Sequence, residues 1–249
     1  MRAIVNADDL GLSPTVNDAV FGLMGAGAIT SATMLAVTPS VEEAAKRVRE
    51  FPACSFGVHL CLTEFRPLTG NPALAPILAD GMFDGQKVRE IPITPSLREA
   101  IADEWFAQVQ RIIDLGVCPS HLDSHHHVHT VPALFGTLKR VQKRFGIRKV
   151  RVSLTIYSPN EAPSRRLLAK KALWNAALRW WGRTTTTRDM TALSAFCDWA
   201  ERGRRFGTRS IELMTHPGHP LFESETARLH AGWHRELPFP VDLINFNQL

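Results

Sequence analysis

The sequence predicts an α/β protein with a mainly parallel sheet, because short apolar runs alternate with helical patterns along its 249 residues. Its length suits a single α/β barrel, which can bury a full core without disulfide staples. Polar residues also recur directly after several apolar runs, where sheets of this class build their sites. With no repeat, low-complexity run or boundary in the sequence, we expect one domain over residues 1–249.

The expected strands are short and rich in apolar or β-branched residues. They cover residues 3–6, 29–37, 56–62, 120–124, 149–156 and 210–215, with a last strand at 242–246. Helices are expected between them, and the first begins with Ser13 as its cap before Pro14. The helices cover residues 14–26, 40–50, 96–115, 132–145, 164–181, 191–204 and 223–236. Residues 63–95 lack periodicity, and we expect them to form a functional loop.

The composition is that of an ordinary globular protein, with 45% apolar and 21% charged residues. The four cysteines form no C-x-x-C pair, and in a chain of this length we expect buried or incidental thiols and not a disulfide framework. The first apolar run is too short for a signal peptide, and no stretch approaches the ~20 apolar residues of a membrane span. We therefore expect a cytoplasmic protein.

Positive charge is concentrated in one part of the chain. Residues 139–183 hold thirteen Lys or Arg and one acidic residue, a net charge of +12, so the remainder carries −7. Such a region can attract nucleic acid, anionic lipid or an anionic substrate, but it is more often a solvated helical face. The basic, tryptophan-containing helix at 164–183 could be a lid, a dimer surface or an interfacial membrane helix. We expect a lid or a packed helix, without membrane contact.

Carboxylates and imidazoles lie toward the carboxyl ends of four of the expected strands. They are Asp8 and Asp9, His59, His125 and His216. Because the carboxyl ends of parallel strands meet at one edge, we expect these side chains to converge. Adjacent carboxylates repel each other unless a cation or a proton lies nearby, and neutral imidazole is a good ligand for zinc, iron, nickel and copper. The pattern predicts a metal site, although His59 or His216 taken alone could be structural.

The histidine-rich segment 121–129 is the strongest single feature, because it holds five of the ten histidines. In extended chain, one face carries His121, Asp123, His125, His127 and His129. Two imidazoles and one carboxylate leave positions open for water and substrate. Non-haem iron oxygenases use the same ligand set, so the ligands alone do not select hydrolysis. A ligand pair of His121 and His125, with His59 outside the shell, also stays open.

Four motifs, in this order, resemble the YdjC-like carbohydrate deacetylases, a family that includes the chitooligosaccharide (diacetylchitobiose) deacetylases. They are Asn6-Ala7-Asp8-Asp9-Leu10-Gly11-Leu12-Ser13, Gly57-Val58-His59-Leu60, His121-Leu122-Asp123-Ser124-His125-His126-His127-Val128-His129 and Glu212-Leu213-Met214-Thr215-His216-Pro217-Gly218. Together they span residues 6–218. Leu10 stands where the family commonly has Phe, which affects packing behind the site and not the metal. Residues 151–189 match no motif, so the resemblance leaves the sugar open.

The resemblance implies a single-domain, distorted (β/α) barrel of the TIM-like type, with one divalent metal. Its pattern assigns the metal to Asp9, His59 and His125, the general base to Asp8 and the general acid to His216. Asp123 and His127 are expected to orient a ligand histidine or to contact substrate. Magnesium or zinc is expected, with cobalt, manganese and nickel as alternatives.

The function expected from this resemblance is hydrolysis of the acetamide of an N-acetylated sugar or chitooligosaccharide by metal-activated water. Two alternatives stay open. One is another metal-dependent hydrolase, such as a phosphoesterase or an enzyme for a different amide or ester, and the other is a non-catalytic sugar-binding barrel. The expected partner is the sugar, without nucleic acid, and either a monomer or a homodimer fits one barrel domain.

Overall fold

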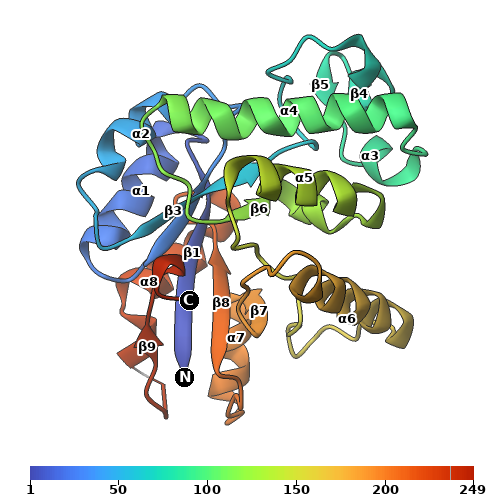
Figure 1. Cartoon of the computed structure of the whole chain (residues 1–249). Coiled ribbons are helices and arrows are strands. Elements are labelled where there is room, and N and C mark those ends of the chain that lie inside the picture. Colours follow the sequence, from blue (N-terminus) through green and yellow to red (C-terminus); the bar gives the residue numbers. More distant parts are fainter. Residues whose placement is uncertain (236) are drawn as a thin grey trace.

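A curved sheet of parallel strands forms the centre of the computed structural model, which describes residues 1–235 and 237–249 (Figure 1). Its strands are β1 (Arg2–Leu10), β2 (Ser31–Met34), β3 (Ser55–Leu60), β6 (Leu122–Ser124), β7 (Asp189–Ala192), β8 (Ser210–Thr215) and β9 (Asp242–Leu243). They lie in the order β6-β3-β2-β1-β8-β7, and the short β9 also pairs with β1. All pairs within this sheet are parallel. β1 is buried from Ala3 to Leu10, as expected for a strand covered on both faces.

The edge between β6 and β7 is bridged by an irregular segment, residues 149–156. Isolated bridges join Val150 to Leu122 and Lys149 to Thr185, and the Thr155 amide donates to the Met190 carbonyl oxygen at 3.0 Å. The sheet thus curves into a distorted barrel, which confirms the predicted fold class.

The prediction of a regular strand at 149–156 was wrong. The Ser153 amide donates to the side chain of Asn175 at 2.9 Å, and not to a neighbouring strand, so the ladder is interrupted there. The Asn175 side chain accepts the hydrogen bond that the Ser153 amide would donate to a neighbouring strand in a regular sheet. β7 was not predicted, because Asp189 and Met190 were assigned to no element and Thr191 and Ala192 to the start of a helix.

Helices surround the sheet, and most begin close to the predicted residues. They are α1 (Pro14–Gly25), α2 (Val41–Val48), α4 (Pro95–Asp114), α5 (Phe135–Phe145), α6 (Arg165–Trp180), α7 (Leu193–Glu201) and α8 (Glu223–His230). Ser13 caps α1 as predicted, by accepting from the Val16 amide at 3.2 Å. α4 begins at Pro95 with Thr94 as its cap, one residue before the predicted start at residue 96. The last helix ends at His230, and its predicted end at Glu236 lies outside the described residues.

The loop between β3 and α4 has short elements of its own. It contains a 3-10 helix (Pro72–Ile77), the hairpin of β4 (Leu78–Ala79) and β5 (Met82–Phe83), and the one-turn α3 (Lys87–Glu90). Glu104 of α4 is fully buried and accepts from the Leu68 and Thr69 amides at 3.1 and 2.8 Å. This carboxylate therefore holds the loop against the barrel. In the described part of the chain, every helix is too short or too polar to cross a bilayer.

Candidate active site

The end of β1 carries two adjacent carboxylates that both reach the site. The pairing of β1 with β2 shifts between Ala7 and Leu10, and Asp9 has a left-handed φ of 64°. Such a bulge changes the direction of one side chain relative to the alternation of a regular strand. Asp8 and Asp9 can therefore face the same space, although neighbours on a regular strand point to opposite faces.

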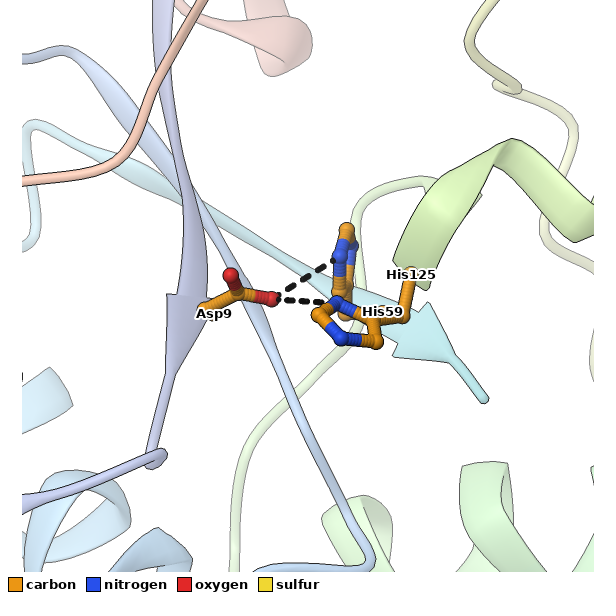
Figure 2. Close-up of side chains that lie close together, drawn as sticks. All are labelled: Asp9, His59 and His125. Carbon is orange, nitrogen blue, oxygen red and sulfur yellow. Dashed lines mark ion pairs between the residues drawn. The ribbon is translucent and has the colours of Figure 1, made fainter. Parts of the chain in front are cut away.

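Three predicted ligands meet at one point, as Figure 2 shows for Asp9, His59 and His125. The Oδ1 atom of Asp9 lies 3.2 Å from Nε2 of His59 and 2.8 Å from Nδ1 of His125. All three residues are buried. Among the described residues, no hydrogen-bond donor satisfies this oxygen of Asp9. One carboxylate and two imidazoles that converge in this way fit a divalent cation with open coordination positions.

His59 is held in place from behind by Asp123 on the neighbouring strand β6. Its Nδ1 atom lies 2.7 Å from Oδ1 of Asp123, and Thr33 donates to the other oxygen of that carboxylate at 2.9 Å. This contact turns Nε2 of His59 toward Asp9. Burial alone would lower the pKa of His59, but the charges of Asp123 and Asp8 raise it to about 10. The surroundings of His59 thus favour a positive charge, which a metal ion would supply.

Asp8 forms a bidentate ion pair with Arg151, whose side chain is fully buried. Both guanidinium Nη atoms donate to the carboxylate at 2.6 Å. Burial would raise the pKa of Asp8, but Arg151 outweighs that effect and holds the pKa well below its usual range. The same guanidinium lies 3.0 Å from Asp123 and donates through Nε to Glu212 at 2.6 Å. Arg151 thus connects three carboxylates around the site.

Sequence reasoning missed Arg151 and counted it only as part of a basic region. One signal was available, because Arg151 lies between Val150 and Val152 in an expected strand. A charged residue in an apolar run needs a buried partner. Glu64 was also missed, since it lies in a loop without a motif, and its carboxylate lies 3.2 Å from Nε2 of His125.

His216 follows β8 and lies at the same cavity. Its backbone amide donates to Glu225 at 2.6 Å, and its ring stacks on Phe222 with centroids 4.4 Å apart. Burial lowers the pKa of His216, although Asp8 and Asp9 act in the opposite direction. The cavity measures about 380 Å³. Its wall contains Asp8, Asp9, His59, His125, His127 and His216, together with the apolar side chains of Leu12, Met214, Leu221 and Phe222.

The remaining histidines of the motif do not share one face. His125–Thr130 forms a 3-10 turn, in which His126 and His127 have left-handed φ values of 50° and 55°. This turn ends the extended chain after Ser124, so the predicted alternation was wrong beyond that residue. His121 stacks on Phe246 with centroids 3.6 Å apart, and it is not among the residues that gather around Asp9.

His127 and His129 have different surroundings. His127 lies in the cavity wall, and burial lowers its pKa to about 3, so the ring is neutral. The ring of His129 is fully buried, contacts Ser124 and lies edge-on to Trp174 of α6, with centroids 5.6 Å apart. His127 can therefore meet a ligand in the cavity, whereas His129 packs behind it.

The barrel and the Asp-His-His cluster at its strand ends define an α/β protein with a candidate metal site. The family model described as YdjC-like protein matches residues 2–241, and this chain belongs to that family. This confirms the resemblance found in the four motifs.

Curated relatives carry deacetylase names. A carbohydrate deacetylase of Geobacillus stearothermophilus is 37% identical over 152 residues, which is 60% of each chain. A chitooligosaccharide deacetylase of Salmonella typhimurium is 32% identical over 216 residues, or 86% of this chain and 80% of that protein. The matches to the Geobacillus protein and to a carbohydrate deacetylase of Halalkalibacterium halodurans thus span only 60% and 62% of those relatives.

A solved structure supports the fold. A proposed cellobiose-phosphate cleavage protein of Enterococcus faecalis V583 superposes with a TM-score of 0.71 at 21% identity, covering 99% of this chain and 98% of that one. At this level of identity the likeness concerns the fold alone.

Proposed function

We propose that this protein is a metal-dependent carbohydrate deacetylase that hydrolyses the acetamide of an N-acetylated sugar or short chitooligosaccharide. The convergence of Asp9, His59 and His125 beside Asp8 carries the proposal, because it joins three ligand atoms to a carboxylate that can accept a proton. The names of the relatives support the substrate class. The family model covers most of residues 1–249, which supports treating them as one domain.

Two imidazoles and a carboxylate would hold the metal. This donor set favours zinc, or else cobalt, nickel or manganese, over magnesium, which prefers oxygen ligands. When bound, the metal supplies a Lewis acid that polarises the acetyl carbonyl and lowers the pKa of water.

Asp8 is the proposed general base. Arg151 keeps it ionised and fixes both of its oxygens. A carboxylate of such low pKa is a weak base, so it can take a proton only from a water that the site has already made acidic. The water oxygen then bonds to the acetyl carbon, and Asp8 carries the proton.

His216 is the proposed general acid. The C–N bond breaks as the sugar nitrogen takes a proton, because an amide nitrogen leaves poorly as an anion. A histidine with a lowered pKa gives up its proton readily once it is protonated. The products are acetate and the free amino sugar. The apolar side chains of Leu12, Met214 and Phe222 in the cavity wall would suit the acetyl methyl group.

The cavity argues against a phosphoesterase. In the described part of the chain, its wall contains neither lysine nor arginine, and the nearby Arg151 is already bonded to Asp8 and Glu212. A phosphate would therefore meet no free cationic side chain. The cytoplasmic setting and the monomer or homodimer state stay predictions.

Acetate release from diacetylchitobiose and a panel of N-acetylated sugars tests the proposal. Metal-loaded wild type should release acetate, and Asp8→Asn should bind metal but lose activity by ~10²–10⁴-fold, as expected for a proton-transfer group. Asp9→Asn should lose both metal binding and activity. The control is Asp18→Asn, which removes an exposed carboxylate on α1 and should keep both metal binding and activity. Release of phosphate from sugar phosphates, or no acetate from any sugar by the metal-loaded protein, would contradict the proposal.

A further inference from the structure

The outward face of α6 carries an apolar stripe that the rest of the barrel leaves uncovered. At helical spacing, Ala169, Leu173, Ala176 and Trp180 lie on one side of the helix, and all four are exposed. Leu173 is 73% exposed and Trp180 is 88% exposed, and Trp181 directly after the helix is 69% exposed. Figure 1 shows α6 at the periphery of the molecule. Two neighbouring tryptophans with this exposure are unusual for a surface that meets only water.

The opposite face of α6 is fixed to the barrel. Trp174, Asn175 and Leu178 are buried. Asn175 accepts from the amide and the hydroxyl of Ser153, both at 2.9 Å. The helix therefore cannot turn its apolar stripe inward without breaking these contacts.

The charge around the stripe has one sign. Residues 162–188 contain seven Lys or Arg and no acidic residue. Arg165, Arg166 and Lys170 are exposed in the first two turns of α6. At the far end of the helix, Trp181 shares a cavity of about 390 Å³ with Lys143 of α5 and with Arg148, which follows α5. The occupant of this face must therefore be anionic as well as partly apolar.

We propose that α6 is an interfacial helix that docks the protein on an anionic phospholipid surface. Leucine and tryptophan side chains enter the boundary between headgroups and acyl chains, while the basic side chains pair with anionic headgroups. A two-fold dimer through α6 would place two such basic faces together without a carboxylate on residues 162–188 to neutralise them. The sequence favoured a lid or packed helix here, and the exposure of the stripe is what argues for a surface contact. This inference does not depend on the proposed deacetylase activity.

Co-sedimentation of the 249-residue chain with vesicles tests the proposal. Vesicles of phosphatidylcholine alone are compared with vesicles containing 40% phosphatidylglycerol at low and high salt. Wild type should bind the anionic vesicles and be released by high salt. Arg165→Gln/Arg166→Gln should weaken binding by about fivefold per residue, which corresponds to the usual contribution of one basic residue near such a surface. Leu173→Gln/Trp180→Gln should weaken it by tenfold or more.

Matched controls remove similar groups elsewhere. Arg204→Gln/Arg205→Gln deletes two exposed arginines before β8, and Met82→Gln replaces an exposed apolar residue of β5. Both controls should bind like wild type, and circular dichroism should show all variants folded. Acetate release from a soluble sugar should be unchanged in the α6 variants, so a failure here is separate from a failure of the deacetylase proposal.

Three outcomes overturn the proposal. Wild type that stays in solution with anionic vesicles removes it directly. Binding that survives in Leu173→Gln/Trp180→Gln shows attraction by charge without insertion of the stripe. A dimer in light scattering that these two substitutions dissociate assigns the face to a second copy of the chain.

Discussion

Arg151 and Asp8 form a bidentate, buried ion pair, in which each guanidinium Nη atom lies 2.6 Å from one of the two carboxylate oxygens. The two residues lie 143 positions apart in the sequence. The pair joins the irregular segment that bridges β6 and β7 to the end of β1, and so links the site to the closure of the barrel.

Replacement of Arg151 by methionine should therefore destabilise the protein strongly. It would leave Asp8, Asp123 and Glu212 buried together without their cation, and breaking a buried pair in this way costs about 3–5 kcal/mol. Arg151→Lys should be intermediate, because one ammonium cannot repeat the bidentate geometry. Urea unfolding measures the free energy of unfolding of both variants.

The control for Arg151 is Arg140→Met. Arg140 makes the same two-bond contact with Glu99, at 2.7 and 2.8 Å, but on the surface. Its loss should leave the urea midpoint nearly unchanged, because exposed pairs contribute little. Similar midpoints for Arg151→Met and Arg140→Met would show that the buried network does not support the fold.

Metal should stabilise the folded protein and not only activate it. A ligand at one hundred times its Kd adds about 2.7 kcal/mol, which for a chain of this length raises Tm by about 5–10 °C. Wild type should lose this increment with a chelator and regain it with zinc. Asp9→Asn should show one Tm under all conditions, measured by scanning calorimetry. A metal-dependent Tm in Asp9→Asn would argue for a ligand set without Asp9, such as Glu64, His125 and His126.

Asp123→Asn should weaken metal binding without removing a ligand. The asparagine can still accept from Nδ1 of His59, but it no longer adds a negative charge behind the ring. Loss of such a supporting carboxylate typically reduces metal affinity by about 10–100-fold. Competition with a chromogenic chelator gives the Kd, and Asp114→Asn, exposed at the end of α4, is the control. Unchanged affinity would show that Asp123 serves Arg151 and Thr33 and not His59.

The sequence predicted the site better where a residue ends a regular strand. Asp9, His59 and His125 each lie at or directly after a strand end, so a parallel sheet brings their backbones to one edge, and the bulge in β1 then turns Asp9 into the site. Arg151 could not be placed this way, because its segment follows no ladder and its partners come from β1, β6 and β8. The turn at His126 also escaped prediction, since its left-handed backbone occurs without a glycine to signal it.

The cysteines offer a test of the loop beside the site. Cys61 follows β3, is buried, and contacts the Glu64 carbonyl oxygen at 3.2 Å. Burial raises the pKa of its thiol to about 11, so at pH 8 only about one Cys61 in a thousand is ionised. Cys118 is exposed. Iodoacetamide should therefore modify Cys118 first and Cys61 last, as read by peptide mass spectrometry. Fast labelling of Cys61 in Cys118→Ser would show that the loop opens in solution.

Gly57 should be intolerant of even one methyl group, although its backbone is not left-handed. A Cβ atom there would lie 2.6 Å from Cε1 of His121 and 2.7 Å from its carbonyl oxygen. The ring cannot retreat because it is stacked on Phe246, and the carbonyl oxygen is held because it accepts from the Val58 amide of β3 at 3.1 Å. Gly57→Ala should thus cost about 1–3 kcal/mol, as expected for an overpacked core.

Gly57→Ala should also weaken metal binding by Asp9, His59 and His125. His59 lies two residues further along β3, so a displaced strand moves its Nε2 atom away from Asp9, and metal affinity should fall together with stability. Gly136→Ala is the matched control, since a Cβ there meets nothing within 4 Å and adds helix propensity to α5. Urea unfolding and metal titration of both variants decide the question. A Gly57→Ala protein with wild-type stability and a wild-type Kd would mean that β3 can shift without disturbing the ligands it carries.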